Sequence, residues 1–268
     1  MGDEGTVGIL NPQAGLATWD LLRTAPCAAL EPFVARYWIV HWDRTEQSQY
    51  TQQVLPHPCM HLAIEPERAS VHGVGSARFV AELRGAGRVI GVKFKPAGFA
   101  AFAEPPMQRF TDRVVPIGEV FGSAGAELAE AVRAEPEVAR ALALVEAFLC
   151  AREPVLDEAA ARADQLVQCA QSDRAIMTAE DLARAFGMSV RSLHRLFTRY
   201  VGVGPKWVIR RARVHEAAER VQQQAKVDWA ALAQELGYHD QAHLIRDFKA
   251  QIGLTPAAYA AHCAASQR

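Results

Sequence analysis

The sequence lacks any long apolar segment and any cysteine pattern that would build a covalent framework. In its 268 residues no hydrophobic run approaches the roughly 18 residues that a membrane span needs, and Glu146 interrupts the best candidate, Ala141–Ala151. Residues Met1–Glu4 are acidic, so we expect no secretory signal. The cysteines number 5, lie far apart and form no Cys-x-x-Cys pair. We therefore expect reduced thiols in a cytoplasmic protein, without structural zinc.

Motifs of several enzyme classes are also missing. The sequence has no Gly-x-Ser-x-Gly, no phosphate-binding loop and no His-Glu-x-x-His. These motifs supply a nucleophile, a phosphate cradle and a metal site, respectively. We therefore expect a protein that is not an enzyme and that needs no cofactor.

Charge is divided unevenly along the chain. The net charge is −1, yet the part from Arg174 onward holds 14 basic and 8 acidic side chains, a net charge of +6. The part before it holds 15 basic and 22 acidic side chains, a net charge of −7. A basic C-terminal third indicates a polyanionic partner.

The hydrophobic pattern predicts an α+β protein, with a mixed, strand-rich domain at residues 1–150 and an all-α domain at 151–268. A short helix is expected near Trp19–Arg23. Gly and Pro turns separate the expected strands, which are Phe33–Trp42, Met60–Ile64, Phe79–Leu83 and Arg88–Phe94.

Residues 119–150 change to helical periodicity, with Pro136 expected in a first turn. Their apolar stripe should pack against the strands, with a dimer seam as the alternative; it comprises Val138, Leu142, Val145 and Leu149. Ala151–Glu158 is the expected linker, and everything after it is expected to be helical.

The most informative feature is an internal repeat. When the chain is shifted by 51 residues, Ser189–Pro205 overlays Asp240–Pro256. The identical pairs are Leu193/Leu244, Arg195/Arg246, Phe197/Phe248, Gly202/Gly253 and Pro205/Pro256. One supersecondary unit is therefore used twice.

Each copy of the repeat predicts a helix-turn-helix. In the first, at about 178–200, Thr178 and Ser189 are placed to cap two helices around a turn at Gly187. In the second, at about 228–251, Asp228 and Asp240 are placed to cap two helices around a turn at Gly237. Between the copies, residues 206–223 predict one helix of roughly 27 Å at 1.5 Å per residue. Such a spacer could hold two reading helices near the ~34 Å of one DNA turn.

In each helix-turn-helix, the exposed face of the second helix is the expected base-reading surface. Arg pairs with guanine, Gln with adenine, and Ile or Ala contacts the thymine methyl group. The expected base-reading residues are Arg191, His194, Arg195, Gln241, Ala242, Ile245 and Arg246. Phosphate contacts, which fix register without reading sequence, are expected from Arg199, Arg210, Arg211 and Lys249. A single surface arginine is usually only solvated, but Arg195 and Arg246 recur at one register beside the same core residues.

These segments resemble the signature of AraC/XylS-type transcription regulators. The resemblance covers roughly Val155–His262 and is carried by Gly237–Lys249, Gly253–Pro256, Tyr259, Gly202–Pro205 and Arg213–Ala217. It implies a bacterial, sequence-specific DNA-binding protein with two helix-turn-helix subdomains joined by a long helix. Double-stranded DNA is the implied partner, while RNA polymerase and a small-molecule effector stay open, as does the choice between monomer and homodimer. A protein that only shapes DNA is the alternative, although the mixture of Gln241, Ala242 and Ile245 favours discrimination between sequences.

The front half resembles a domain found ahead of such modules in other bacterial regulators. The shared pieces are Tyr37–Trp38, Val54–Cys59, His72–Gly75, Gly91–Phe99 and Thr111–Pro116. The resemblance implies a sensing or dimerisation domain with no assigned ligand.

Two kinds of sensing site are considered for this domain. An organic ligand would lie in a pocket formed by Trp38, Trp42, His57, His61, Phe94 and Phe99. A metal-responsive regulator would instead use His57, Cys59 and His61, with His72 as a fourth ligand, although Pro56 and Pro58 disfavour a regular strand there. An interaction domain that senses nothing is the third alternative.

Overall fold

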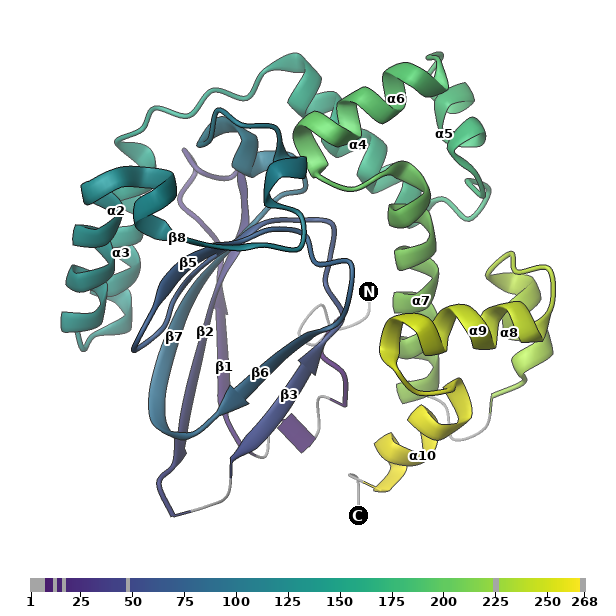
Figure 1. Cartoon of the computed structure of the whole chain (residues 1–268), viewed down its shortest axis with the longest axis horizontal. Coiled ribbons are helices and arrows are strands. Elements are labelled where there is room, and N and C mark those ends of the chain that lie inside the picture. Colours follow the sequence, from purple (N-terminus) through teal and green to yellow (C-terminus); the bar gives the residue numbers. More distant parts are fainter. Residues whose placement is uncertain (1–7, 12–13, 16–17, 47–48, 224–226, 266–268) are drawn as a thin grey trace.

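The computed structural model of the chain describes residues 8–11, 14–15, 18–46, 49–223 and 227–265. A β-domain comes first, and a helical domain begins after residue 157 (Figure 1). The strands are β1 (Asp20–Thr24), β2 (Val34–Arg44), β3 (Tyr50–Val54), β4 (His61–Ile64), β5 (Ala69–His72), β6 (Phe79–Leu83), β7 (Gly85–Phe94) and β8 (Val114–Pro116). The predicted α+β fold class, strand-rich and then helical, is confirmed.

The β-domain is an antiparallel sheet beside a separate two-stranded ribbon. The 6-stranded sheet has the order β1-β2-β7-β4-β5-β8, and β3 pairs with β6. Two short 3₁₀ segments, η1 (Gly98–Ala101) and η2 (Met107–Phe110), lie between β7 and β8. All four strands expected from the sequence are present, as β2, β4, β6 and β7.

Glycines on β7 set the packing of one sheet face. Trp38 lies opposite Gly91, and Trp42 opposite Gly87. A Cβ atom on Gly91 would lie 1.9 Å from the Trp38 ring, and one on Gly87 would lie 2.4 Å from the Trp42 ring. The two indoles therefore occupy space that any other residue on β7 would fill.

Helices α2 (Ile117–Ala134) and α3 (Val138–Cys150) cover the other face of the sheet (Figure 1). Val145 and Leu149 are fully buried in the same core as Ile90 and Val92 of β7, and Val138 and Leu142 pack against it. The predicted packing of this stripe on the strands is confirmed.

Two local expectations for the β-domain are wrong. The segment near Trp19–Arg23 is not a helix but forms β1, which pairs along the edge of β2 from Asp20↔His41 to Thr24↔Tyr37. Pro136 precedes α3 and is not in its first turn, because the helix begins at Val138 with Glu137 as its N-cap. In both segments, pairing and packing with distant residues override the local pattern.

The helical domain has two lobes that share one helix. Its helices are α4 (Glu158–Ser172), α5 (Ala179–Ala185), α6 (Val190–Leu196), the π-helical segment η3 (Phe197–Val201), α7 (Pro205–Gln223), α8 (Trp229–Glu235), α9 (Gln241–Ile252) and α10 (Pro256–Ala265). Val208 and Ile209 of α7 belong to the core of the first lobe, whereas Val214 and Val221 belong to that of the second.

The two domains pack directly against each other. Val74 and Ala97 of the β-domain lie in the core of the first lobe, and Leu10 and Leu55 lie in that of the second. The carboxylate of Asp164 on α4 also accepts a hydrogen bond from the Ala97 backbone N–H at 2.9 Å. Both lobes are therefore attached to the β-domain by buried contacts.

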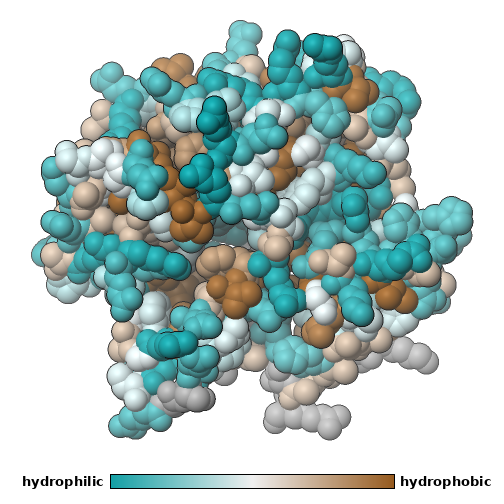
Figure 2. Space-filling view, in the orientation of Figure 1, coloured by the Kyte–Doolittle hydropathy of each residue, from teal (hydrophilic) through white to brown (hydrophobic). Residues whose placement is uncertain are grey.

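The described helices include none that combines the length and apolarity needed to cross a bilayer. Figure 2 shows hydrophilic side chains over most of one face, with apolar residues in small separate patches.

We expect Gly91→Ala to destabilise the β-domain, because the added Cβ would overlap the Trp38 ring at 1.9 Å. Overpacking of this kind costs about 1–3 kcal/mol of unfolding free energy. Urea unfolding measures the change. Gly118→Ala is the matched control, since no atom lies within 4 Å of a Cβ built there. An equal effect of the two substitutions would contradict this account of the sheet.

Candidate nucleic-acid interface

Helix α6 is held at its start by local caps and presents a polar face. The side chain of Ser189 accepts a hydrogen bond from the Ser192 backbone N–H, and Gly187 makes the preceding turn at φ +61°. Upstream, Thr178 and Asp181 form the capping box predicted for α5. The helix buries Leu193, whereas the expected base-reading residues Arg191, His194 and Arg195 are all exposed.

Helix α9 repeats this arrangement in the second lobe. Asp240 accepts a hydrogen bond from the His243 backbone N–H at 2.7 Å, and Gly237 makes the turn at φ +70°. Leu244 and Phe248 are fully buried. On the outer face, Gln241, Ala242 and Arg246 are exposed and Ile245 is half-buried. Each lobe therefore presents one capped helix whose outer face carries an arginine at the repeated register.

A buried carboxylate fixes α9 against the rest of the second lobe. Asp247 is 2% exposed. It forms an ion pair with Arg210 of α7 and accepts hydrogen bonds from the Tyr238 hydroxyl at 2.9 Å and the Gln251 amide at 3.0 Å. Burial by itself would raise the pKa of Asp247, but the hydrogen bonds from Arg210, Gln251 and Tyr238 outweigh it and hold the pKa below its usual range. Asp247 is thus an ionised anchor for α9.

Two expected phosphate contacts have other roles in this structure. Arg211 is 1% exposed, so the expectation that it contacts DNA is wrong for this arrangement of the domains. It donates a hydrogen bond to the Ser76 carbonyl of the β-domain at 2.7 Å, and its guanidinium lies 4.5 Å from the Trp207 ring centroid. Burial lowers the pKa of Arg211 to about 10. Arg210, partly exposed, is engaged by Asp247.

The other two expected phosphate contacts remain on the surface. Lys249 is exposed near the end of α9. Arg199 is exposed on η3 and donates a hydrogen bond to the Glu104 carbonyl of the β-domain at 3.1 Å. Lys249 is therefore accessible to a phosphate, as its predicted role requires, whereas Arg199 would have to leave Glu104 to meet one.

The organic-ligand pocket expected from six residues of the β-domain does not form as such. Phe94 and Phe99 are fully buried, with ring centroids 4.9 Å apart in the core. Trp38 lies on the opposite face of the sheet from that core, and the His57 ring stacks on His215 of α7 at 4.4 Å. The prediction is wrong because these residues belong to different faces of the domain.

The expected metal ligands are not gathered either. Cys59 Sγ and His61 Nε2 lie 3.5 Å apart, but His57 is stacked on His215. His72 contacts the Ser70 hydroxyl at 3.0 Å. Burial, with Lys93 and other charged neighbours, lowers the pKa of His61 to about 3. Among the residues that the structure describes, no three His, Cys, Asp or Glu side chains group as a metal site.

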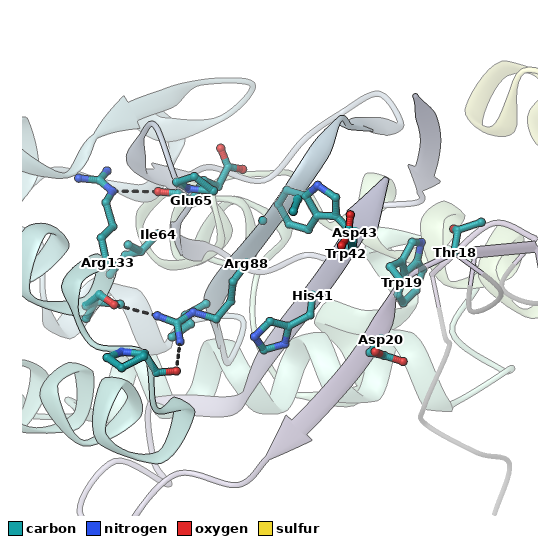
Figure 3. A pocket seen from close by; sticks show the side chains of 16 residues that line it. Thr18, Trp19, Asp20, His41, Trp42, Asp43, Ile64, Glu65, Arg88 and Arg133 are labelled. Carbon is teal, nitrogen blue, oxygen red and sulfur yellow. Dashed lines mark hydrogen bonds between the residues drawn. The ribbon is translucent and has the colours of Figure 1, made fainter. Parts of the chain in front are cut away.

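The β-domain does contain a cavity of about 950 Å³. Of the residues that line it, only Trp42 was expected from the sequence to bind a ligand. Figure 3 shows Trp19, His41 and Trp42 along one side, with Arg88 and Arg133 on the other. Its walls come from β1, β2, β4, β7 and α2, so no local pattern could indicate it.

Backbone carbonyls hold the cationic wall of this cavity in place. Arg88 donates hydrogen bonds to the carbonyls of Val132, Glu135 and Pro136, and Arg133 donates to that of Glu65 at 2.9 Å. The indole N–H of Trp19, on the opposite wall, is buried, and no hydrogen-bond partner for it exists among the residues that the structure describes.

The β-domain contacts the C-terminal ends of η3 and α9, one in each lobe. The Thr111 hydroxyl donates to the Gly202 carbonyl, directly after η3, at 2.7 Å. Arg78 donates to the Ile252 carbonyl, the last residue of α9, at 2.6 Å. These two hydrogen bonds attach the ends of α9 and of the α6–η3 segment to the β-domain.

Comparisons with known proteins match one family model to each part of the chain. Residues 22–116 match a domain of unknown function (DUF6597), and residues 182–262 match a helix-turn-helix domain. No curated protein matches the chain.

Among solved structures the chain is similar to ToxT from Vibrio cholerae. One ToxT structure has 11% identity and a TM-score of 0.41, and the match covers 90% of this chain and 97% of that one. An unsaturated fatty acid-bound ToxT has 8% identity and a TM-score of 0.37, with 90% and 94% covered. ToxT bound to (E)-4-(8-methylnaphthalen-1-yl)but-3-enoic acid has 9% identity and a TM-score of 0.41, with 92% and 99% covered.

Asp247→Asn should destabilise the second lobe, because it removes the charge that pairs with Arg210. The expected loss is about 3 kcal/mol of unfolding free energy at pH 7. Since the pKa of Asp247 is depressed in the folded chain, this stabilisation is present above its unfolded pKa of about 4 and is lost as the pH falls through the lower folded value.

Urea unfolding of both proteins over a series of pH values tests this. The difference between wild type and Asp247→Asn should shrink below about pH 4. Glu127→Gln, at an exposed position on α2, serves as the control. A difference that stays constant with pH would show that the charge of Asp247 is not what stabilises α9.

Proposed function

We propose that this chain, whose C-terminal part is an AraC-type helix-turn-helix domain, is a transcription regulator that reads two successive major-groove segments with α6 and α9. One observation carries the proposal. The exposed residues Arg195 and Arg246 occupy the same register on two separately capped helices, one in each lobe. Each lies beside a fully buried leucine and phenylalanine that fix its helix.

The chemistry of the two faces supports base reading. Arginine can donate two hydrogen bonds to guanine, and Gln241 can pair with adenine. Ala242 and Ile245 offer apolar contact to a thymine methyl group. Arg191 and His194 extend the same surface in the first lobe, and Lys249 supplies charge for a phosphate at the end of α9.

The length of α7 suits this mode of binding. Its 19 residues span about 28 Å at 1.5 Å per residue, and both lobes are built on it. A rigid connection of this length is close to the ~34 Å of one DNA turn. One chain could therefore contact two adjacent grooves, and dimerisation is not required.

The β-domain would adjust DNA affinity through its hold on the lobes. It bonds to Gly202 and Ile252 at the ends of the reading elements and occupies Arg199 and Arg211, two residues otherwise suited to phosphates. A shift of the β-domain would release these groups together. DNA and the β-domain then compete for the same cations.

A small organic effector in the cavity beside Trp19 would provide that shift. The indoles of Trp19 and Trp42 suit a flat apolar group, and Arg88 and Arg133 suit an anionic one. Pockets of this size are typical of small-molecule sites, and in this one polar and apolar residues line the walls together. The chemistry points to an aromatic carboxylate.

A short series of contacts leads from this cavity to the second lobe. Gly15 packs closely against both Trp19 and Gln52, since a Cβ built on it would lie 2.6 Å from one and 2.4 Å from the other. Gln52 donates to the Leu10 carbonyl at 2.9 Å, and the next residue, Asn11, donates to the Tyr259 hydroxyl on α10 at 3.2 Å. A ligand that moves Trp19 would therefore act on the segment in contact with α10.

Base reading is tested by substitution after a preferred site has been selected from random DNA. Arg195→Ala and Arg246→Ala should each cost about 1–3 kcal/mol on that site and relax sequence preference locally. Lys249→Ala should weaken binding to all sequences and lower the salt slope by about 1.

The matched control is Arg184→Ala, an exposed arginine on α5 that pairs with Asp181. It should leave sequence preference unchanged. If both arginine variants at the repeated register lose affinity equally for selected and random DNA, they contact only the backbone, and the proposed reading mode is wrong.

The effector site is tested by a thermal-shift screen of aromatic carboxylates on the full chain. A compound at about 100 times its Kd should add about 2.7 kcal/mol of unfolding free energy and change the Kd for the selected DNA. His41→Ala and Arg133→Ala should remove both effects. Leu22→Ala, 52% exposed on β1 and outside the cavity, should retain them. Stabilisation that survives both cavity substitutions would place the effector elsewhere.

A further inference from the structure

Two cysteines that are distant in the sequence lie together where the β-domain passes into the linker. Cys27 lies between β1 and β2, and Cys150 is the last residue of α3. Their sulfur atoms are 4.0 Å apart, close enough for a hydrogen bond between the thiols. Both side chains are half-buried, so a small solute can reach them.

The backbone holds Cys27 in this position. Its N–H donates to the Glu146 carboxylate, one turn before Cys150 on α3, at 2.7 Å. Its carbonyl accepts from the N–H groups of Leu30 at 2.9 Å and Glu31 at 3.2 Å. The Cys27 turn is thus fixed to α3 by contacts that do not involve either sulfur.

We propose that Cys27 and Cys150 form a reversible disulfide when the protein meets a hydroperoxide, which makes this pair an oxidation site of the β-domain. The sulfurs must approach from 4.0 Å to about 2.05 Å. Rotation of the two side chains supplies this approach, since the contacts that fix the Cys27 turn involve neither sulfur.

The reaction balances with hydroperoxide as the oxidant. One of the two thiols attacks the peroxide, so that an S–O bond forms, the O–O bond breaks and one water or alcohol leaves. The other thiol then attacks the sulfenic sulfur, forming the S–S bond and releasing water. The two thiols lose two electrons and two protons, and the hydroperoxide is reduced.

Burial, the contact with Cys27 and the nearby Glu146 carboxylate raise the pKa of the Cys150 thiol. The proposal does not depend on which of the two sulfurs attacks the oxidant first, since the same disulfide forms in either order.

The remaining cysteines distinguish this pair from chance oxidation. Cys59 and Cys263 are buried, and Cys169 is half-buried on α4. In the part of the chain that the structure describes, the contact between Cys27 and Cys150 is the one thiol–thiol contact found. Cys169 is therefore the matched control, with comparable exposure but no neighbouring thiol.

The pair is placed to affect the helical domain. The linker starts directly after Cys150, and the guanidinium of Arg152 lies 3.4 Å from the Phe148 ring centroid and 5.0 Å from that of Phe121. Arg152 lines a cavity of about 500 Å³ together with Arg199, which bonds to Glu104. A disulfide at Cys150 would therefore restrain the start of the linker, close to the cavity that Arg152 lines with Arg199 of the first lobe.

The test oxidises the purified full chain with hydrogen peroxide after removal of reductant. The expected product is a monomer lighter by two hydrogens, with a cross-linked peptide joining the segments that contain Cys27 and Cys150. Dithiothreitol should reverse it. Cys27→Ser and Cys150→Ser should each abolish the cross-link, and Cys169→Ser should keep it.

Three outcomes would overturn the proposal. These are cross-linked dimers in place of the intramolecular bond, stable sulfinic acid at Cys27 in the wild type, and a cross-link that survives Cys27→Ser. Each would show that the two sulfurs do not meet under oxidising conditions.

The effect on DNA rests on the proposed function and is measured separately. The oxidised wild type should differ at least twofold from the reduced form in Kd for the selected DNA, and Cys150→Ser should show no such change. A disulfide that forms without any change in Kd would overturn the regulatory role but not the oxidation site. Failure of both forms to bind selected DNA would instead contradict the proposed function.

Discussion

Helix α7 is buried on three sides, and the arrangement of the whole molecule depends on this. Val208 and Ile209 pack into the first lobe, and Val214 and Val221 into the second. A third side, with Arg211 and His215, meets the β-domain (Figure 1). The early turns of α7 pack into the first lobe and its later turns into the second, so a rotation of α7 would disturb both lobe cores and the contact with the β-domain.

The contact with the β-domain differs chemically from the two lobe cores. His215 is 8% exposed, stacks on His57 and lies 3.3 Å from the Pro56 carbonyl. Burial lowers its pKa to about 3, so it is neutral at pH 7. Arg211 keeps one hydrogen bond to Ser76, while its Nε and Nη1 groups find no hydrogen-bond partner in the described part of the chain.

This polar burial has an energetic consequence. A buried donor without a partner costs about 1–3 kcal/mol, because it loses its water and gains nothing in exchange. Separation of the β-domain from α7 would return Arg211 to solvent. The lobe cores contain mainly aliphatic and aromatic side chains and have no such reason to open. We therefore expect the proposed responses to a ligand, to oxidation and to DNA to act at the domain interface.

The repeat, its caps and the outward residues could be predicted from the sequence because they depend on neighbours within one or two helical turns. Thr178, Ser189, Asp228 and Asp240 cap their helices as predicted, and Leu193 and Leu244 are buried. Strands rich in aromatic and β-branched residues were recognisable for the same reason. The edge strand β1 was not, since it exists by pairing with β2.

What the sequence by itself determined is thus a pair of matched helix-turn-helix units behind a strand-rich domain. Only the tertiary structure decided which cations face solvent and which face the β-domain: Arg210 and Arg211 are neighbours in sequence, yet one meets Asp247 and the other Ser76. The tertiary structure also forms the cavity beside Trp19 and brings the sulfur atoms of Cys27 and Cys150 into contact. Periodicity records which face of an element is apolar, but it does not record which distant element covers that face.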